Sequence, residues 1–139
     1  MCFIFSTDST RSSCLSLSID ADIALSQLFF DGVAVPRSLI PNYNLPLSPD
    51  TLGLPDSVRV LAVAAQAGLS TYGIIASDST GRILTGGQWK CTGLVFPGWM
   101  TAGFDDSCWP SAAVVTDSSV PPGSITPPIS AGGAWIWAT

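Results

Sequence analysis

The chain contains no histidine and no glutamate, and charged residues make up only 11% of its 139 residues. Without histidine there is no Ser–His or Cys–His pair, and Lys90 is the only lysine, so an activated nucleophile lacks its usual base. All ten acidic residues are aspartates, and the five basic residues leave a net charge of −5. This balance excludes the basic surface that nucleic-acid-binding proteins need. We therefore expect a non-enzymatic protein that binds no nucleic acid.

Long apolar runs are also missing. The longest candidate, Val58 to Ala67, is interrupted by Arg59 and Gln66 and is shorter than the ~18 residues that span a bilayer. We therefore expect no membrane partner.

Hydrophobic residues make up 47% of the chain, enough for the core of one domain over residues 1–139. The surface must be covered mainly by 19 Ser, 11 Thr and small apolar groups, which protect poorly against self-association.

Four cysteines are present, namely Cys2, Cys14, Cys91 and Cys108. They allow three disulfide connectivities, of which the simplest is local: Cys2 with Cys14, and Cys91 with Cys108. A zinc site is disfavoured because there is no C-x2-C pair and no histidine to supplement the thiols. Disulfides indicate an oxidising compartment, so we expect a secreted, extracellular protein.

Short apolar–polar alternations separated by Gly and Pro turns predict an all-β sandwich with few helices. The most specific signal is a β-hairpin over residues 28–35, with Asp31-Gly32 as a type I′ turn. A helix competes with a strand over residues 58–65, where Val58, Val60 and Val63 favour the strand. The other predicted strands cover residues 14–19, 71–77, 82–85, 112–115 and 134–138.

Three segments are expected to lie outside this regular pattern. Residues 1–13 form an N-terminal segment whose apolar start predicts an edge strand or a strand exchanged with a neighbour. Residues 36–55 form a long ordered connection. Residues 117–133 form a Pro/Ser/Thr-rich loop of polyproline-II character. Candidates for O-glycosylation or proline hydroxylation in this loop are Pro121, Pro122, Ser124, Thr126, Pro127, Pro128 and Ser130.

Residues 89–110 concentrate three of the five tryptophans in one irregular stretch. Trp89 and Trp109 are expected to anchor this stretch to the core, together with Trp135 and Trp137 at the end of the chain. Trp99, which follows Pro97-Gly98 in the middle of the stretch, is the candidate exposed contact for a sugar or a neighbouring subunit.

Several of these pieces together resemble the galactose-binding-domain-like jelly-roll β-sandwiches of extracellular proteins and glycoside hydrolases. They are the D-x-D turn at Asp20, the L-F-F-D-G-V-A-V hairpin, W-K-C at Trp89, F-D-D-S-C-W-P at Phe104 and the terminal W-I-W. The resemblance covers roughly Leu15 to Trp137. It implies a jelly roll with long, disulfide-pinned loops, and sugar binding does not follow from the fold alone.

Four aspartates form the remaining site candidates. Adjacent carboxylates at Asp105 and Asp106 are expected to cap a turn rather than to act as an acid–base pair. With Asp20 and Asp22 they are weak candidates for calcium, which prefers oxygen ligands. No other cofactor is expected.

Taken together, these features predict a secreted, non-enzymatic structural subunit that associates with copies of itself into a filament or matrix. The alternative is a carbohydrate-binding module, free-standing or cut from a larger glycoside hydrolase, in which Trp99 contacts a glycan.

Overall fold

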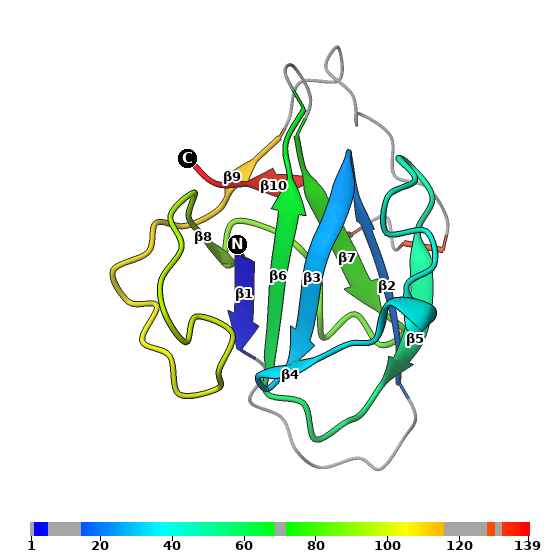
Figure 1. Cartoon of the computed structure of the whole chain (residues 1–139), viewed down its shortest axis with the longest axis horizontal. Coiled ribbons are helices and arrows are strands. Elements are labelled where there is room, and N and C mark those ends of the chain that lie inside the picture. Colours follow the sequence, from blue (N-terminus) through cyan, green and yellow to red (C-terminus); the bar gives the residue numbers. More distant parts are fainter. Residues whose placement is uncertain (1, 6–14, 69–71, 116–127, 130–131) are drawn as a thin grey trace.

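The chain folds as two antiparallel β-sheets (Figure 1). The structure, a computed structural model, describes residues 2–5, 15–68, 72–115, 128–129 and 132–139, and of residues 3–5 only the backbone. The first sheet, sheet A, has the strand order β4-β3-β6-β1-β8. Its strands are β1 (Cys2–Phe5), β3 (Ala24–Phe30), β4 (Val33–Ala34), β6 (Val60–Gln66) and β8 (Lys90–Cys91).

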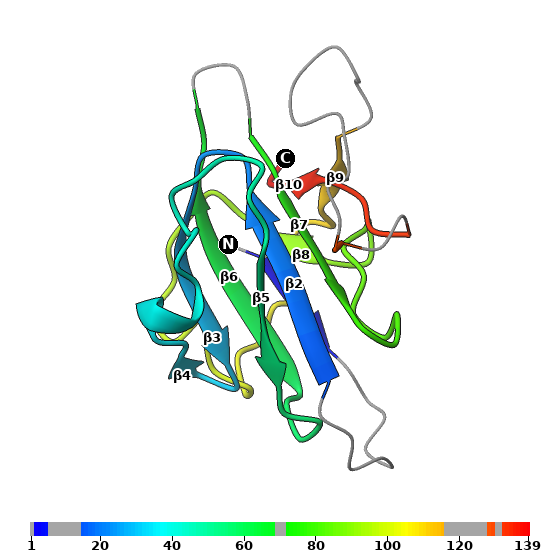
Figure 2. The ribbon, with the colours of Figure 1, turned by 90° about the vertical axis from the view of Figure 1, so that its right-hand side faces the viewer.

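The second sheet, sheet B, has the order β5-β2-β7-β10-β9 and lies against sheet A as a second layer (Figure 2). Its strands are β2 (Leu15–Ala21), β5 (Asp50–Leu54), β7 (Ile74–Asp78), β9 (Ala113–Val114) and β10 (Ile136–Trp137). A short 3-10 helix, η1 (Arg37–Leu39), precedes β5. No helix within the described residues is long and apolar enough to cross a membrane. The predicted all-β class is confirmed.

The main core lies between the sheets and is built from alternate residues of neighbouring strands. In β2, Leu17 and Ile19 point into it, and the register places Leu17 opposite Leu52 of β5. Ala76 of β7 lies opposite Ile19 on the other side. Because side chains alternate along a strand, the residues between them, such as Ser18, face outward. The period-2 pattern predicted for residues 14–19 is therefore correct from Leu15 to Ile19, and Cys14 lies outside the described residues.

The predicted hairpin is confirmed as β3 and β4. Asp31 and Gly32 have φ angles of 49° and 85°, the left-handed conformation that a type I′ turn requires at both positions. The Asp31 carboxylate also accepts hydrogen bonds from the backbone N–H groups of Arg59 and Val60, at 2.9 and 2.7 Å. The aspartate therefore joins the turn to the start of β6, which is a strand and not a helix.

Three features differ from the predictions. The N-terminal strand β1 is not at an edge, because it pairs with β6 on one side and with β8 on the other. The connection over residues 36–55 ends in a regular strand, β5, whose Leu52 and Leu54 enter the core. Residues 82–85 contribute only an isolated bridge between Ser77 and Leu84.

Candidate functional site

The disulfide joins Cys2 to Cys91, so the predicted local pairings are wrong. These cysteines lie directly opposite each other on β1 and β8, with their Cα atoms 4.4 Å apart. Cys108 is a free, exposed thiol, and Cys14 lies outside the described residues. The local pairing fails because strand pairing, not sequence distance, decides which cysteines meet.

Residues 92–110, here called the lid, follow β8 directly and cover part of the outer face of sheet A. Trp99 and Trp109 of the lid form a second apolar cluster with Phe29, Val60 and Ala62 of β3 and β6. The rings of Trp99 and Phe29 meet edge to face, with centroids 5.6 Å apart. The lid is thus a packed layer with its own small core.

Trp99 is only 4% exposed, so its predicted role as a freely exposed contact residue is wrong. Its ring is needed to cover the apolar outward side chains of sheet A, which the sequence pattern of one strand does not reveal. The anchoring roles expected for Trp89 and Trp109 agree with their burial, and the Trp89 indole N–H donates to the Leu84 carbonyl at 3.0 Å. Trp135 is buried with Ile75 and Ile129 in a third cluster.

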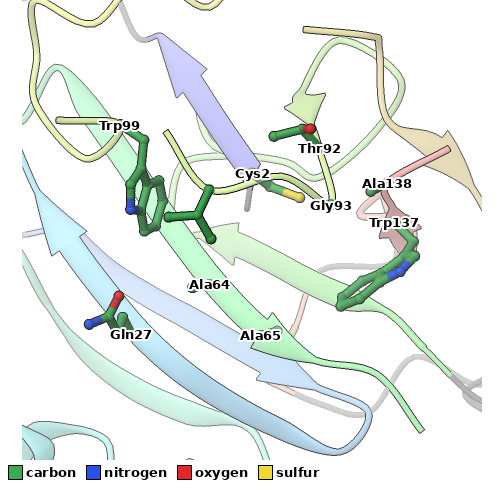
Figure 3. A pocket seen from close by; sticks show the side chains of 10 residues that line it. Cys2, Gln27, Ala64, Ala65, Thr92, Gly93, Trp99, Trp137 and Ala138 are labelled. Atoms are coloured by element: carbon green, nitrogen blue, oxygen red, sulfur yellow. The ribbon is translucent and has the colours of Figure 1, made fainter. Parts of the chain in front are cut away.

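A groove of about 290 Å³ lies where the lid stops covering sheet A. Trp99 is on one side of it and Trp137 on the other, with Ala64 and Ala65 of β6 between them (Figure 3). The small alanine side chains leave this space open. The other lining residues are Cys2, Gln27, Thr92, Gly93, Val95 and Ala138.

Polar groups in this groove are few, and none of its lining residues is charged. The side chain of exposed Gln27 makes no hydrogen bond to any residue that the structure describes, which leaves its amide available to a ligand. The Thr92 hydroxyl accepts a bond from the Leu94 N–H at 3.1 Å. Trp137 is half-buried and packs near Tyr72, with ring centroids 6.1 Å apart. The groove therefore suits an uncharged, largely apolar ligand.

Beside the groove, the lid presents consecutive exposed apolar side chains. Leu94 is 66% exposed and Val95 is 80% exposed, and Phe96 next to them is also exposed. No charged residue occurs from 92 to 104. Val95 belongs both to this tip and to the lining of the groove, so the two form one continuous surface.

The outer face of sheet B carries a different hollow, of about 480 Å³. It is lined mainly by hydroxyl groups of β2, β5 and the turn after β7, with Pro128 at its border. The Ser18 and Thr51 hydroxyls bond to each other at 3.0 Å. The Asp78 carboxylate is satisfied by the Thr80 hydroxyl and the Ile83 N–H, at 2.6 and 2.9 Å.

The four candidate calcium ligands do not form one site. Asp20 and Asp22 are buried at the end of β2, whereas Asp105 and Asp106 lie in the lid, where the Ser107 N–H donates to Asp105 at 3.0 Å. Hydrogen bonds from the Ser107 side chain and then from its N–H lower the pKa of Asp105, and the N–H bond is the turn cap predicted for this residue. Within the described ranges, no three acidic, Cys or His residues are arranged to hold a metal ion.

The buried carboxylates at the end of β2 are electrostatically unusual. Burial raises the pKa of Asp20 to about 6, and repulsion from Asp50 and Asp22 adds to this shift. Burial also raises the pKa of Asp50, although the Asn42 N–H donates to it at 3.1 Å. One carboxylate oxygen each of Asp20 and Asp22 is buried without a hydrogen-bond partner among the described residues. The cluster therefore favours protonation of Asp20 in the folded state.

Sequence reasoning missed the residues that open the groove, namely Gln27, Ala64 and Ala65. The sequence feature that could have indicated the groove is the pair of small residues, Ala64 and Ala65, near the end of β6, where larger side chains would have filled the space. Of the predicted modification sites, Pro128 is exposed, while Pro121, Pro122, Ser124, Thr126, Pro127 and Ser130 lie outside the described residues. No protein-family model, no curated protein and no solved structure matches this chain.

Proposed function

We propose that this chain is an extracellular, non-enzymatic structural subunit whose copies associate through the lid. The observation that carries this proposal is the exposed apolar tip formed by Leu94, Val95 and Phe96. Adjacent exposed apolar side chains without charged neighbours mark surfaces that become buried on association. The buried Cys2–Cys91 disulfide supports an oxidising, extracellular location.

The proposed architecture is a galactose-binding-domain-like jelly roll. Two five-stranded antiparallel sheets around one core support it, as does the position of the F-D-D-S-C-W-P segment, whose Phe104 and Trp109 rings pack 5.4 Å apart over sheet A. The Ser/Thr/Pro residues 121–130 are proposed as sites of O-glycosylation or proline hydroxylation. Mass spectrometry of native material tests that part of the proposal.

The self-association proposal is tested by size-exclusion chromatography with light scattering over a range of concentrations. We expect the mass of the wild-type particle to rise with concentration, and Leu94→Asp to weaken association at least tenfold because it places a charge in the buried contact. Leu45→Asp is the matched control, since Leu45 is also an exposed leucine but lies outside the lid. A folded wild-type protein that stays monomeric at high concentration would contradict the proposal.

A second candidate function is carbohydrate binding, which the groove between Trp99 and Trp137 favours. Aromatic side chains pack against the apolar faces of sugar rings, and the Gln27 amide offers both a donor and an acceptor to hydroxyl groups. Glycan-array binding that is lost in Gln27→Ala and retained in Gln66→Ala would support this candidate. Gln66 is a suitable control because it is exposed at the end of β6 and does not line the groove.

A further inference from the structure

We propose that the hydroxyl-lined hollow on the outer face of sheet B binds an uncharged, polyhydroxylated small molecule, either a sugar or an open-chain polyol. The hollow lies on a different face from the lid and its groove, so this inference goes beyond the proposed function and does not depend on it. Three observations carry it. They are the place and size of the hollow, the free hydrogen-bonding capacity of its lining, and the lack of basic residues among the described residues that line it.

The hollow lies over three adjacent strands of sheet B, β5, β2 and β7 (Figure 2). Its volume, about 480 Å³, falls in the range of about 300–1,000 Å³ that is usual for small-molecule sites. The register places Thr51 and Ser77 on either side of Ser18, so the three side chains form a row across the sheet. Because neighbouring strands are about 4.8 Å apart, one small molecule can contact several of these residues at once.

The space beside Ser16, the next lining residue of β2 on this face, is open on one side. Gly53 of β5 lies opposite Ser16 in the register, and a Cβ at Gly53 would meet no atom within 4 Å. On the other side, the Ser79 N–H donates to the Ser16 carbonyl at 2.9 Å, and the Ser16 N–H donates to the Ser79 hydroxyl at 3.2 Å. A ligand can therefore reach Ser16 from the β5 side.

The hydroxyl groups of the lining keep hydrogen-bonding capacity for a ligand. A hydroxyl provides one donor and two acceptor positions. The Ser16 hydroxyl makes no hydrogen bond to any residue that the structure describes. Ser18 and Thr51 share a single bond of 3.0 Å, and the Ser79 hydroxyl accepts from Ser16 and keeps its own proton. A polyhydroxylated ligand thus finds new partners for the hydroxyls that it removes from water, which is the main cost of burying them.

The groove on the side of sheet A offers such a ligand fewer partners. Among its described lining residues, only Gln27 and Thr92 have polar side chains apart from the Trp137 ring, and the Thr92 hydroxyl already accepts a hydrogen bond. Trp99 is only 4% exposed, so little of its ring is open for stacking against a sugar. A polyhydroxylated ligand therefore loses fewer hydrogen bonds in the hollow than in the groove.

The charge of the lining restricts the ligand to an uncharged one. Asp78 is the only charged residue among the described residues that line the hollow, and it is 5% exposed. Its carboxylate already accepts from the Thr80 hydroxyl and the Ile83 N–H, so a cationic ligand finds no free, accessible partner. A phosphate or carboxylate ligand would find no basic partner in this lining, and the charge of Asp78 would repel it.

The direct test is an NMR titration of the full chain with glucose, sorbitol and glucuronate as probes. The protein is first shown by mass spectrometry to carry no glycan, so that no attached sugar competes for the hollow. We expect saturable shifts in the amides of residues 16–18, 51–53 and 77–81 with the neutral probes, and at least tenfold weaker binding of glucuronate. Tighter binding of glucose than of sorbitol identifies a cyclic sugar as the ligand, and the reverse order identifies an open-chain polyol.

Two substitutions with matched controls locate the site. Gly53→Leu places a side chain beside Ser16 and is expected to weaken binding at least tenfold, whereas Gly103→Leu, at an equally open glycine of the lid, should not. Ser16→Ala removes a hydroxyl without a bonding partner among the described residues and should weaken binding about two- to tenfold. Ser26→Ala is its control, because Ser26 is also half-buried but lies on β3 of sheet A.

Three outcomes would overturn the inference. One is a folded protein that shows no saturable shift with either neutral probe. Another is binding that shifts Gln27 and persists in Gly53→Leu, which would place the sugar in the groove instead. The third is glucuronate that binds as tightly as glucose. None of these measurements depends on association between copies, so the proposed structural role is tested separately.

Discussion

The outer faces of the two sheets differ in the chemistry of their side chains and in whether a second layer of the chain covers them. On sheet A, Phe29, Val60 and Ala62 point outward and are covered by Trp99 and Trp109 of the lid. On sheet B, the outward row runs from Thr51 through Ser18 to Ser77, and the Ser18 and Thr51 hydroxyls satisfy each other.

This difference shows why the lid exists. Apolar outward residues need a second layer to exclude water, whereas a row of hydroxyls does not. The lid, residues 92–110, contains no strand, so ring packing and the disulfide just before it must hold it. Where the lid stops covering sheet A, an apolar surface remains open as the groove, and the lid itself exposes its apolar tip beside it.

The largest expected effect comes from removing the disulfide. For a loop of 89 residues, the chain-entropy model assigns the crosslink about 4.6 kcal/mol of stability. We therefore expect the double substitution Cys2→Ser and Cys91→Ser to lower the free energy of unfolding by about this amount in urea titrations. Cys108→Ser, at an exposed free thiol, should have no such effect. Equal stability of the two variants would contradict the pairing.

A smaller effect is expected from Trp99→Ala, which removes the ring that covers Phe29. Deleting a buried aromatic side chain costs about 3 kcal/mol. Because Trp99 belongs to the lid cluster and not to the main core, hydrogen exchange should accelerate in residues 92–110 before it does in β2 and β7. Uniform acceleration across both regions would show that the lid is not a separate layer.

On the sheet B side, stability should depend on pH through Asp20. Its pKa is about 6 in the folded state against 3.8 as the ordinary value, so the folded state binds the proton more tightly than the unfolded state. The resulting stabilisation is complete below about pH 3.8 and is lost as the pH rises through 6. We expect a loss on the order of 1–2 kcal/mol between pH 4 and 7, and Asp20→Asn to abolish most of it. A wild-type protein whose stability increases over this interval would refute this assignment.

The smallest effect is expected from Ser18→Ala on the hydroxyl row. The substitution removes one hydrogen bond, to Thr51, and a neutral hydrogen bond contributes about 1 kcal/mol. Thermal unfolding should show a change of this size or less, and the lid should keep its exchange rates. A loss as large as that from Trp99→Ala would mean that the two faces do not differ as described.

Local features of the fold could be predicted from the sequence, because they depend on neighbouring residues. The Asp31-Gly32 turn requires positive φ at both positions, and the alternation along β2 defines one buried face. The burial of Trp89 and Trp109 also follows from the apolar rings themselves.

The features that could not be predicted, namely the disulfide pairing, the burial of Trp99 and the groove, depend on contacts between distant segments. Cys91 lies 17 residues before Cys108 in the sequence but pairs with Cys2, because β1 inserts between β6 and β8. Trp99 is buried because the outward face of β3 and β6 needs cover, and no pattern within residues 92–110 shows this. The groove likewise requires knowing that Ala64 and Trp137 come together from different sheets.

The central claim, that the uncovered apolar part of the sheet A side joins copies of the chain, is tested most directly by hydrogen–deuterium exchange at low and high protein concentration. We predict that protection increases with concentration in residues 92–98, next to the groove, and stays constant in β2 and β5 of sheet B. Unchanged protection in the lid, or an increase confined to sheet B, would contradict the account.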